Sequence, residues 1–302
     1  MPSLRRLAAG PHLVVAAVSQ PDRPRGRGRK RSASPVAAEA ERLGIAALRT
    51  ESVGEPDFVA QLGALRPDLG VVVAFGQFLP RRVRELPRSG YLINAHASLL
   101  PRHRGAAPIA RAILAGDTET GISVMRVERE MDAGAVALVR RTAIGSEETA
   151  GELEARLAEL AAEAIAAAIE MMAANRVVWT EQEEARASLA PKLGPDEARL
   201  DWSQPAEALV RRVRALAPRP GAFASFAGER LRILRASVLP AGGDTDLPGT
   251  VRLAPLRIAT GDGWLAPRVL QRAGGKPLDV EDFQRGRGLP DGARLGADEA
   301  GG

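Results

Sequence analysis

The sequence predicts an α/β domain built on a doubly wound, mainly parallel sheet, followed by a smaller all-β domain. Continuous apolar runs at residues 14–18 and 69–75 alternate with helical segments, a pattern typical of parallel strands buried on both faces. From residue 222 onward, short apolar segments are separated by turn residues, which favours a small antiparallel barrel. A chain of 302 residues is long enough for both domains.

Proline and glycine mark the ends of the predicted helices in the first domain. Pro2 can begin a helix and Gly10 ends one, and Ser34-Pro35 and Gly44 do the same for the next. On the longest predicted helix, leucines and alanines at intervals of four and three residues form one apolar stripe that we assign to the core. The predicted helices are residues 2–8, 35–43, 56–65, 106–116 and 147–175, and the further strands are 92–93, 121–127 and 135–144.

The second domain is predicted to begin at Asp201-Trp202-Ser203, after a polar stretch that reads as a linker. A helix over residues 206–216 precedes strands at 222–226, 231–239, 249–253, 257–259 and 263–270. The arginines on these strands favour an RNA-facing surface: Arg230, Arg232, Arg235 and Arg268. We therefore predict a catalytic domain at 1–176, a linker at 177–198 and a second domain at 199–302 with a flexible Gly/Ala/Asp-rich tail.

Composition excludes several classes of site. The chain has no cysteine and three scattered histidines, so we expect no disulfide and a reaction without a metal. No apolar run reaches the roughly 18 residues of a membrane span, and we expect a cytoplasmic protein that does not bind a membrane. The net charge of +5 favours a polyanionic partner. Because an arginine excess is also typical of GC-rich genomes, the distribution of charge matters more than its total.

One segment concentrates positive charge. Residues 20–31 read Gln-Pro-Asp-Arg-Pro-Arg-Gly-Arg-Gly-Arg-Lys-Arg, in which Asp22 is the only acid. The basic residues are Arg23, Arg25, Arg27, Arg29, Lys30 and Arg31. The glycine and proline content predicts an irregular loop, and a solvated loop with no partner is one reading. A phosphate backbone would neutralise these charges with release of counterions, which favours contact with RNA.

A second segment presents two polar side chains at the end of a strand. Asn94 and His96 follow Leu92-Ile93 and lie two residues apart, so an extended backbone points both to the same side. The carboxyl ends of strands in open α/β sheets are where ligands bind. An amide and an imidazole are thus predicted together at a ligand-binding edge.

The wider segment resembles a known signature. Residues 94–108 read Asn-Ala-His-Ala-Ser-Leu-Leu-Pro-Arg-His-Arg-Gly-Ala-Ala-Pro, with Gly-Asp-Thr-Glu-Thr-Gly at 116–121 and Met-Asp-Ala-Gly at 131–134. This pattern resembles the folate-dependent formyltransferases, and within them it is most similar to the methionyl-tRNA formyltransferases. One position differs, because His103 stands where the family usually has an aromatic residue.

The resemblance implies a Rossmann-like formyltransferase fold with an OB-like C-terminal domain that binds tRNA. It implies transfer of the formyl group of 10-formyltetrahydrofolate to the α-amino group of methionyl initiator tRNA, for translation initiation, by a monomer. The implied catalytic residues are Asn94, His96 and Asp132. The implied folate contacts are Ser98, Leu99, Leu100, Pro101, Gly76, Gln77 and Phe78. The basic loop is implied to lie against the acceptor end of the tRNA, with Arg27 as the matched residue.

This chemistry suits those side chains. Acyl transfer develops an oxyanion, and each donor placed on it is worth about 2.7–4 kcal/mol. Asn94 can give one N–H and a protonated His96 a second. Asp132, directly or through a water molecule, is suited to the proton transfers, and a carboxylate beside an imidazole favours its charged form.

Three alternatives stay open. The first is a formyltransferase acting on another amine, such as glycinamide ribonucleotide or an amino sugar nucleotide. The second is a related hydrolase that releases formate, and the third is a non-catalytic tRNA-binding protein on the same scaffold.

The N-terminus departs from the family. Its members begin with a strand and a glycine-containing turn, whereas this chain starts at Met1-Pro2-Ser3-Leu4, where the family's first helix is under way. We expect the first strand to be missing from this reading frame and the native protein to begin about 10–20 residues upstream.

Overall fold

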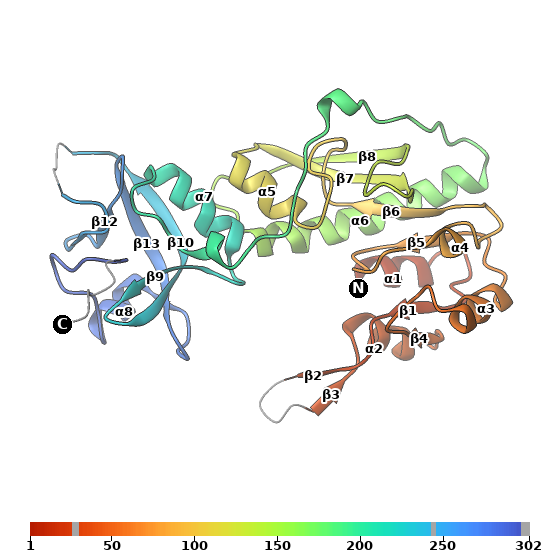
Figure 1. Cartoon of the computed structure of the whole chain (residues 1–302), viewed down its shortest axis with the longest axis horizontal. Helices are drawn as coiled ribbons and strands as arrows, with labels where there is room; N and C mark the ends of the chain where they lie inside the picture. Colours follow the sequence, from red (N-terminus) through yellow and green to blue (C-terminus); the bar gives the residue numbers. More distant parts are fainter. Residues whose placement is uncertain (26–29, 243–245, 297–302) are drawn as a thin grey trace. The chain divides into compact units, whose positions relative to one another are not determined.

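The computed structural model describes residues 1–25, 30–242 and 246–296, and the last residues of the tail predicted to be flexible lie outside this range. The chain divides into two compact units (Figure 1). The first contains residues 1–105, 120–142 and 155–189, and the second contains residues 106–119, 143–154 and 190–302. Each unit therefore draws on segments distant in the sequence.

The first unit holds two separate sheets, each of which contains a parallel pair of strands. In one, β1 (Ala17–Ser19) pairs with β4 (Ala47–Arg49). The other has the order β5-β6-β7-β8, formed by β5 (Gly70–Val72), β6 (Leu92–His96), β7 (Glu119–Arg126) and β8 (Val136–Ala143). β5 and β6 are parallel, whereas β6 and β7 are antiparallel. The predicted parallel pairing is confirmed, but the strands do not form one continuous sheet.

The helices begin where the sequence places a proline or a cap. α1 (Pro2–Ala8), α2 (Pro35–Arg42) and α3 (Pro56–Ala64) each start at proline, whose missing N–H costs nothing in a first turn. The Ser34 hydroxyl also accepts the Ala37 N–H at 3.1 Å. A short α4 (Arg81–Arg84) follows β5. α1, α2 and α3 bear out the predicted boundaries to within one residue, whereas α4 was not predicted.

The long helix α6 (Ala150–Ala173) begins with a capping box. The Thr149 N–H donates to Glu152 Oε2 at 2.9 Å, and the Glu152 N–H donates to Thr149 Oγ1 at 3.4 Å. The hydrogen bonds from Thr149, with an ion pair to Arg235, lower the pKa of Glu152 to about 2.

The basic segment is more regular than predicted. β2 (Arg23–Arg25) and β3 (Lys30–Ser32) form an antiparallel hairpin in which Pro24 lies opposite Arg31. The prediction of an irregular loop is wrong for these residues. Each strand of a two-stranded ribbon has one edge without a partner strand. Pro24 lacks an N–H, and β2 tolerates it because no donor is needed on that unpaired edge.

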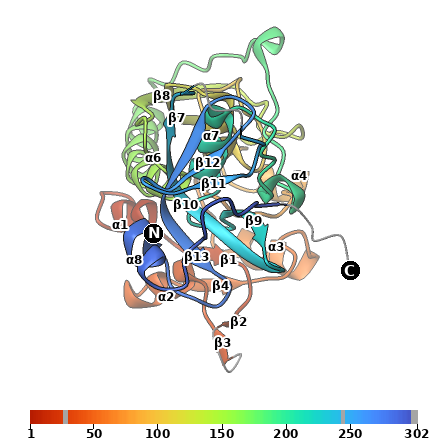
Figure 2. The ribbon, with the colours of Figure 1, turned by 90° about the vertical axis from the view of Figure 1, so that its left-hand side faces the viewer.

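The second unit combines helices with antiparallel strands. α7 (Ala206–Leu216) packs against β10 and α5 (Pro108–Ala115) (Figures 1 and 2). The strands are β9 (Ala222–Phe226), β10 (Glu229–Leu239), β11 (Val251–Arg252), β12 (Arg257–Ala259), β13 (Trp264–Arg272) and β14 (Leu278–Asp279), followed by α8 (Val280–Arg285). Their order is β11-β12-β13-β10-β9, with β14 beside β13. β9 and β11 are bridged by the segment that follows α8. The Leu295 N–H donates to the Gly249 carbonyl oxygen at 2.9 Å, and the Gly296 N–H donates to the Ser225 carbonyl oxygen of β9 at 2.8 Å, in keeping with the predicted barrel.

One core fills the second unit. Leu209, Val213 and Leu216 of α7 are at most 1% exposed and face buried β-strand residues such as Ile233 and Leu265. The predicted linker contributes two short 3₁₀ turns, Glu184–Arg186 and Asp196–Ala198, rather than a structureless stretch.

Glu39 on α2 links α1 to α2 and makes that contact sensitive to pH. Its Oε1 accepts from Arg5 Nε and from Arg42 Nη2, each at 2.6 Å. The hydrogen bonds from Arg42 and Arg5 lower the pKa of Glu39 to about 2. A carboxylate with a lowered folded-state pKa stabilises the fold above its unfolded value near 4.5, and this contribution is lost as the pH falls toward 2.

We therefore predict that Glu39→Gln flattens the pH dependence of the unfolding free energy between pH 4.5 and 2, and lowers stability at pH 7. Chemical denaturation across this range measures it. Glu154→Gln, at an exposed position of α6, is the matched control. If the E39Q curve ran parallel to that of the unaltered protein, the ion pairs would contribute nothing.

Candidate active site

His96, the last residue of β6, is held between two acceptors. The side chain is 6% exposed. Nε2 donates to the His103 carbonyl oxygen at 2.8 Å, and Nδ1 lies 3.4 Å from Asp132 Oδ2. A carbonyl oxygen only accepts, so Nε2 carries a proton, and a neutral ring has no second proton to offer Asp132. An imidazolium satisfies both neighbours.

Asp132 occupies the turn after β7, with a positive φ of 54°. Its side chain is 14% exposed, and Oδ2 accepts the Gly105 N–H at 2.9 Å. Gly134 in the same turn approaches β7 closely, because a Cβ there would lie 2.1 Å from the Arg126 carbonyl oxygen. The predicted pair of His96 and Asp132 is thus brought together, although 36 residues separate them in the sequence.

Gln182 fixes the turn that carries Asp132. Its Nε2 donates to the carbonyl oxygens of Asp132 and Gly134, each at 2.8 Å. Its Oε1 accepts from Arg104 Nε at 3.0 Å, and the buried Arg104 also donates to Glu184 at 3.0 Å. This chain of polar contacts joins the segments on both sides of the imidazole.

Ser188 fixes the turn that carries the other acceptor. Its Oγ accepts the His103 N–H at 2.9 Å, and its carbonyl oxygen accepts the Arg104 N–H at 2.8 Å. His103 has a φ of 59° and presents its carbonyl oxygen to His96. Residue 103 therefore contacts His96 through its backbone carbonyl only. A histidine at this position, where the family usually has an aromatic residue, can make the same contact.

Sequence reasoning missed Gln182 and Ser188. Both lie in the polar stretch assigned to a linker, where no periodicity marks a buried side chain. The sequence gives only an indirect signal for them. The backbone groups of the 101–105 turn need hydrogen-bond partners, and these must come from another segment.

Asn94 lies beside this pair with its side-chain amide unused. Its backbone lies opposite Val72 of β5 and Met125 of β7. Over the ranges that the structure describes, the Asn94 side chain makes no hydrogen bond, and the residue is partly exposed. It shares a face of β6 with His96 because two residues separate them.

The segment expected to bind folate has an inner and an outer part. Ser98 is fully buried, and its hydroxyl donates to the Arg102 carbonyl oxygen at 2.6 Å. Leu99 packs on β7, where its Cδ2 would lie 2.7 Å from a Cβ at Gly121. Leu100 and Pro101 remain partly exposed. The first two residues shape the segment from within, and the last two present surface.

The loop after β5, residues 76–78, also has an inner and an outer part. Gly76 has a φ of 75°, which favours glycine. Gln77 Nε2 donates to the Thr50 carbonyl oxygen at 3.2 Å, and Oε1 accepts the Val53 N–H at 2.9 Å. Phe78 is 72% exposed. Gln77 thus holds a neighbouring loop, and Phe78 is an apolar side chain that this loop leaves exposed.

The predicted RNA contacts are only partly described. Arg23 and Arg31 are exposed on β2 and β3. The predicted contacts Arg27 and Arg29 lie outside the described residues, as do the side chains of Arg25 and Lys30. Asp22, the acid of this segment, pairs with Arg49 at 2.8 Å, which leaves the hairpin strongly basic.

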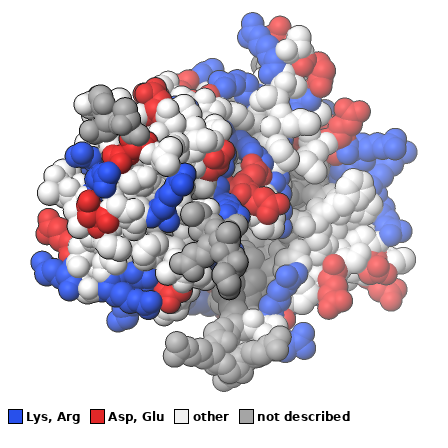
Figure 3. Space-filling view, turned by 60° about the vertical axis from the view of Figure 1, so that its left-hand side comes forward, with Lys and Arg blue, Asp and Glu red and all other residues white. Residues whose placement is uncertain are grey.

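The arginines of the second unit are largely paired. Arg235 forms an ion pair with Glu152, Arg268 lies 3.1 Å from Glu147, and Arg230 stacks over Phe223 at 3.8 Å. Acidic and basic side chains are interspersed over the face drawn in Figure 3. Two of the four arginines predicted to face RNA, Arg235 and Arg268, are therefore neutralised locally by acidic side chains.

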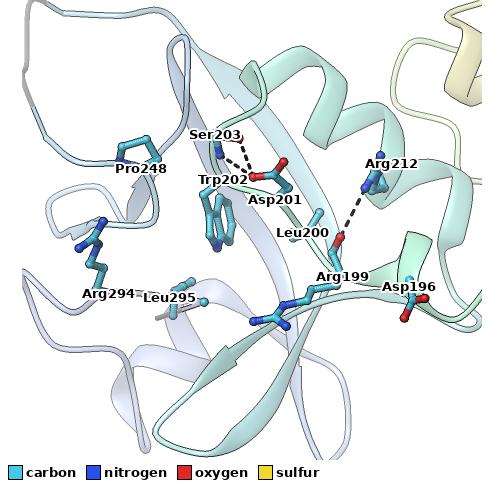
Figure 4. Close-up of a pocket in the computed structure, with 11 residues that line it drawn as sticks. Asp196, Arg199, Leu200, Asp201, Trp202, Ser203, Arg212, Pro248, Arg294 and Leu295 are labelled. Carbon is cyan, nitrogen blue, oxygen red and sulfur yellow. Dashed lines mark hydrogen bonds between the residues drawn. The ribbon is translucent and has the colours of Figure 1, made fainter. Parts of the chain in front are cut away.

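Two cavities lie away from His96. One of about 670 Å³ is in the second unit beside Trp202, Arg212 and Arg294 (Figure 4). The other, of about 370 Å³, lies beside Asp22, Arg23 and Arg31 of the first unit. In the described part of the chain, no cluster of three or more metal-binding side chains occurs and no helix is long and apolar enough to cross a membrane.

A buried imidazole–carboxylate pair with a free amide beside it, at the carboxyl end of a strand, is typical of an acid–base site in an α/β enzyme. The sequence model for formyl transferase matches residues 4–169, and that for the formyl transferase C-terminal domain matches residues 192–288. The chain belongs to the formyl transferase family.

Proteins named methionyl-tRNA formyltransferase are similar over almost the whole chain. The one from Xanthomonas campestris pv. campestris is 47% identical over 286 residues, covering 93% of this chain and 92% of the relative. The one from Rhodopseudomonas palustris is 42% identical over 293 residues, covering 96% and 93%.

Solved structures share the fold at low identity. WlaRD, a sugar 3N-formyl transferase, has a TM-score of 0.65 at 13% identity and covers 91% of this chain and 94% of its own. HypX from Aquifex aeolicus, in complex with tetrahydrofolic acid, has a TM-score of 0.59 at 21% identity and covers 83% and 44%. A methionyl-tRNA formyltransferase from Clostridium thermocellum has a TM-score of 0.51 at 18% identity and covers 72% and 87%.

The contacts of Gln182 predict a local effect. Gln182→Ala removes two hydrogen bonds to the 132–134 turn, each worth about 1 kcal/mol. Amide exchange at Ala133 and Gly134 should accelerate about tenfold or more, while exchange in β10 stays unchanged. Exchange measured by NMR decides this, with Gln61→Ala on the exposed face of α3 as control. Equal exchange in the two variants would show that Gln182 does not hold the turn.

Proposed function

We propose that this chain transfers the formyl group from N10 of 10-formyltetrahydrofolate to the α-amino group of methionyl initiator tRNA. The observation that carries the proposal is the buried His96–Asp132 pair beside the free Asn94 amide. Identity of 42–47% to proteins named methionyl-tRNA formyltransferase supports this choice of amine.

The three polar side chains divide the work of an acyl transfer. The amine attacks the formyl carbon, and an oxyanion develops on the formyl oxygen. Asn94, whose side chain makes no hydrogen bond within the described residues, donates to that oxyanion. His96 is held by His103 and Asp132, so its contribution is positive charge beside the oxyanion, with its Nε2–H released from the His103 carbonyl as a second donor.

Asp132 carries the proton transfers. The attacking ammonium must lose a proton, and N10 of the folate must gain one as the C–N bond breaks. The Asp132 carboxylate is partly exposed and fixed by the Gly105 N–H, so it can exchange a proton directly or through a water molecule.

The folate is proposed to lie along the segments that follow β5 and β6. Phe78, Leu100 and Pro101 offer apolar surface suited to a pterin ring. Ser98, Leu99, Gly76 and Gln77 set the shape of these two segments through the contacts described above. No metal is needed for this reaction.

The tRNA is proposed to meet the β2–β3 hairpin and the residues between its strands. Exposed Arg23 and Arg31 and the acid-free remainder of the segment suit a phosphate backbone. We further propose that the protein acts as a monomer and that the reaction takes place in the cytoplasm, where initiator tRNA is charged.

The rival amines are separated by one experiment. A single-turnover assay with 10-formyltetrahydrofolate is run with charged initiator tRNA, with glycinamide ribonucleotide, with an amino sugar nucleotide, or with water alone. Formyl transfer to the tRNA alone supports the proposal. Transfer to another amine, or formate release without one, would refute it.

Removal of either member of the buried pair should abolish formyl transfer without weakening tRNA binding. His96→Ala and Asp132→Asn are each expected to lower kcat by about 100-fold or more, since both act on the reacting atoms. tRNA affinity, measured by filter binding, should stay within about twofold. His12→Ala, an exposed histidine, is the control. Near-normal turnover in either variant would overturn the assigned roles.

Neutralising the basic segment should have the opposite effect. Arg25, Arg27 and Arg29 changed together to Gln should weaken tRNA binding and reduce the salt slope, since each lost phosphate contact lowers that slope by about 1. The folate KM should not change. The same three-charge change at exposed Arg6, Arg82 and Arg176 is the control. A salt slope equal to that of the control would identify the segment as solvated loop only.

A further inference from the structure

One arginine and two aromatic rings form a cluster in the first unit that the proposed mechanism does not use. The Arg126 Cζ atom lies 4.5 Å from the centroid of the Tyr91 ring and 4.2 Å from that of the Trp179 ring. The two rings meet edge to face, with centroids 5.4 Å apart and an interplanar angle of 83°. We call these three residues the arginine clamp.

The two rings explain why the guanidinium lies where it does. Within the part of the chain that the structure describes, Arg126 Nε is buried and has no hydrogen-bond partner. A buried donor without an acceptor is costly. A cation over an aromatic face is attracted to it, and this attraction increases when water is excluded. The contacts to Tyr91 and Trp179 are therefore the interactions that hold this side of the Arg126 guanidinium.

Two members of the clamp lie on the strands that carry the acid–base pair. Tyr91 directly precedes β6, which ends at His96. Arg126 is the last residue of β7, and the β7–β8 loop that follows it carries Asp132. Arg126 lies opposite Ile93 in the ladder between the two strands. The contact of Arg126 with Tyr91 therefore fixes the end of β7 against the beginning of β6.

The third member belongs to the segment that holds the far end of the β7–β8 loop. Trp179 is followed by Thr180, which exchanges two backbone hydrogen bonds with Val136 at 2.8 and 2.9 Å. Three residues after Trp179, Gln182 donates to the carbonyl oxygen of Asp132. The contact of the arginine with Trp179 therefore ties the start of the loop to the segment that fixes its end.

The clamp lies where the ladder between β7 and β8 ends. The Arg126 N–H donates to the Ala135 carbonyl oxygen at 2.9 Å and closes the base of the loop. Hydrogen bonds at the end of a ladder can open locally at a low free energy. A displacement of about 1 Å in a catalytic group can lower the rate by about 100-fold. Contacts that keep the base of this loop closed therefore affect the placement of Asp132.

We propose that Arg126 is a positioning residue of the acid–base pair. Held between Tyr91 and Trp179, it fixes the β7–β8 loop relative to β6 and so keeps the Asp132 carboxylate beside His96. This inference rests on the proposed function, because Arg126 acts through the two residues assigned to formyl transfer and not on the reacting atoms.

The first test measures the position of Asp132 without any substrate. The Gly105 N–H donates to Asp132 Oδ2 at 2.9 Å, so exchange of this amide, followed by NMR, reports on the carboxylate. Arg126→Met keeps a long unbranched side chain but removes the charge. It should accelerate exchange at Gly105 by about tenfold or more. Exchange at His103, whose N–H donates to Ser188, should not change.

A second cation and a matched control separate the effect of charge from that of a lost side chain. Arg126→Lys should restore most of the protection at Gly105, because an ammonium group also binds aromatic faces. Arg257→Met is the control, since Arg257 Cζ lies 4.6 Å from the centroid of the Trp264 ring in the second unit. Equal exchange at Gly105 in the Arg126→Met and Arg257→Met variants would overturn the proposal. A lysine variant as exchange-prone as the methionine variant would also overturn it.

The second test is kinetic. Arg126→Met should lower kcat by about tenfold or more, while the folate KM and the tRNA affinity stay within about twofold, because Asp132 is displaced and the binding surfaces are not. Arg126→Lys should recover most of kcat. A raised KM with unchanged kcat would refute a positioning role, as would a lower Tm with both kinetic constants unchanged.

The two tests keep this inference distinct from the proposed function. If the unaltered chain formylated a different amine, the kinetic test would use that amine, and if it formylated none, the proposed function would fail while exchange at Gly105 still decided the role of Arg126. If Arg126→Met does not fold, Tyr91→Leu removes one ring and leaves the charge. It should accelerate exchange at Gly105 in the same direction, and unchanged exchange there would overturn the proposal.

Discussion

The imidazole of His96 lies between the carbonyl oxygen of His103 and the carboxylate of Asp132, and the rest of the site depends on that placement. A buried charge is costly unless it is paired and hydrogen-bonded. Here the two acceptors stand on separate turns, one after β6 and one after β7. Gln182 and Ser188, from a third segment, hold these turns at the right distance. The geometry of the imidazole–carboxylate pair is therefore a property of three chain segments rather than of one motif.

Local chemistry explains what the sequence could predict. Helix ends followed from Pro2, Pro35 and Pro56, and α7 lies at residues 206–216 as predicted. The common side of Asn94 and His96 followed from the two-residue period of a strand. Each of these depends on residues close in sequence, where propensity and periodicity carry the information.

Contacts between distant segments explain what the sequence did not predict. Nothing near Gln182 shows that its amide meets the carbonyl of Asp132, because the stretch around it has no periodicity. Gln77 was expected to face a ligand, yet its polar atoms satisfy backbone groups at Thr50 and Val53. Even β1 is shorter than the apolar run at residues 14–18, since only residues 17–19 find a ladder partner in β4.

The two edges of β6 bear on different parts of the site. β5 positions Asn94 through the pairing of Val72 with Asn94, and the loop with Gly76, Gln77 and Phe78 follows β5 directly. His96 and Asp132 are held instead by the turns after β6 and β7 and by Gln182. A change in β5 or in the loop after it should therefore alter the surface proposed for folate, and the amide proposed for the oxyanion, more than it disturbs the imidazole–carboxylate pair.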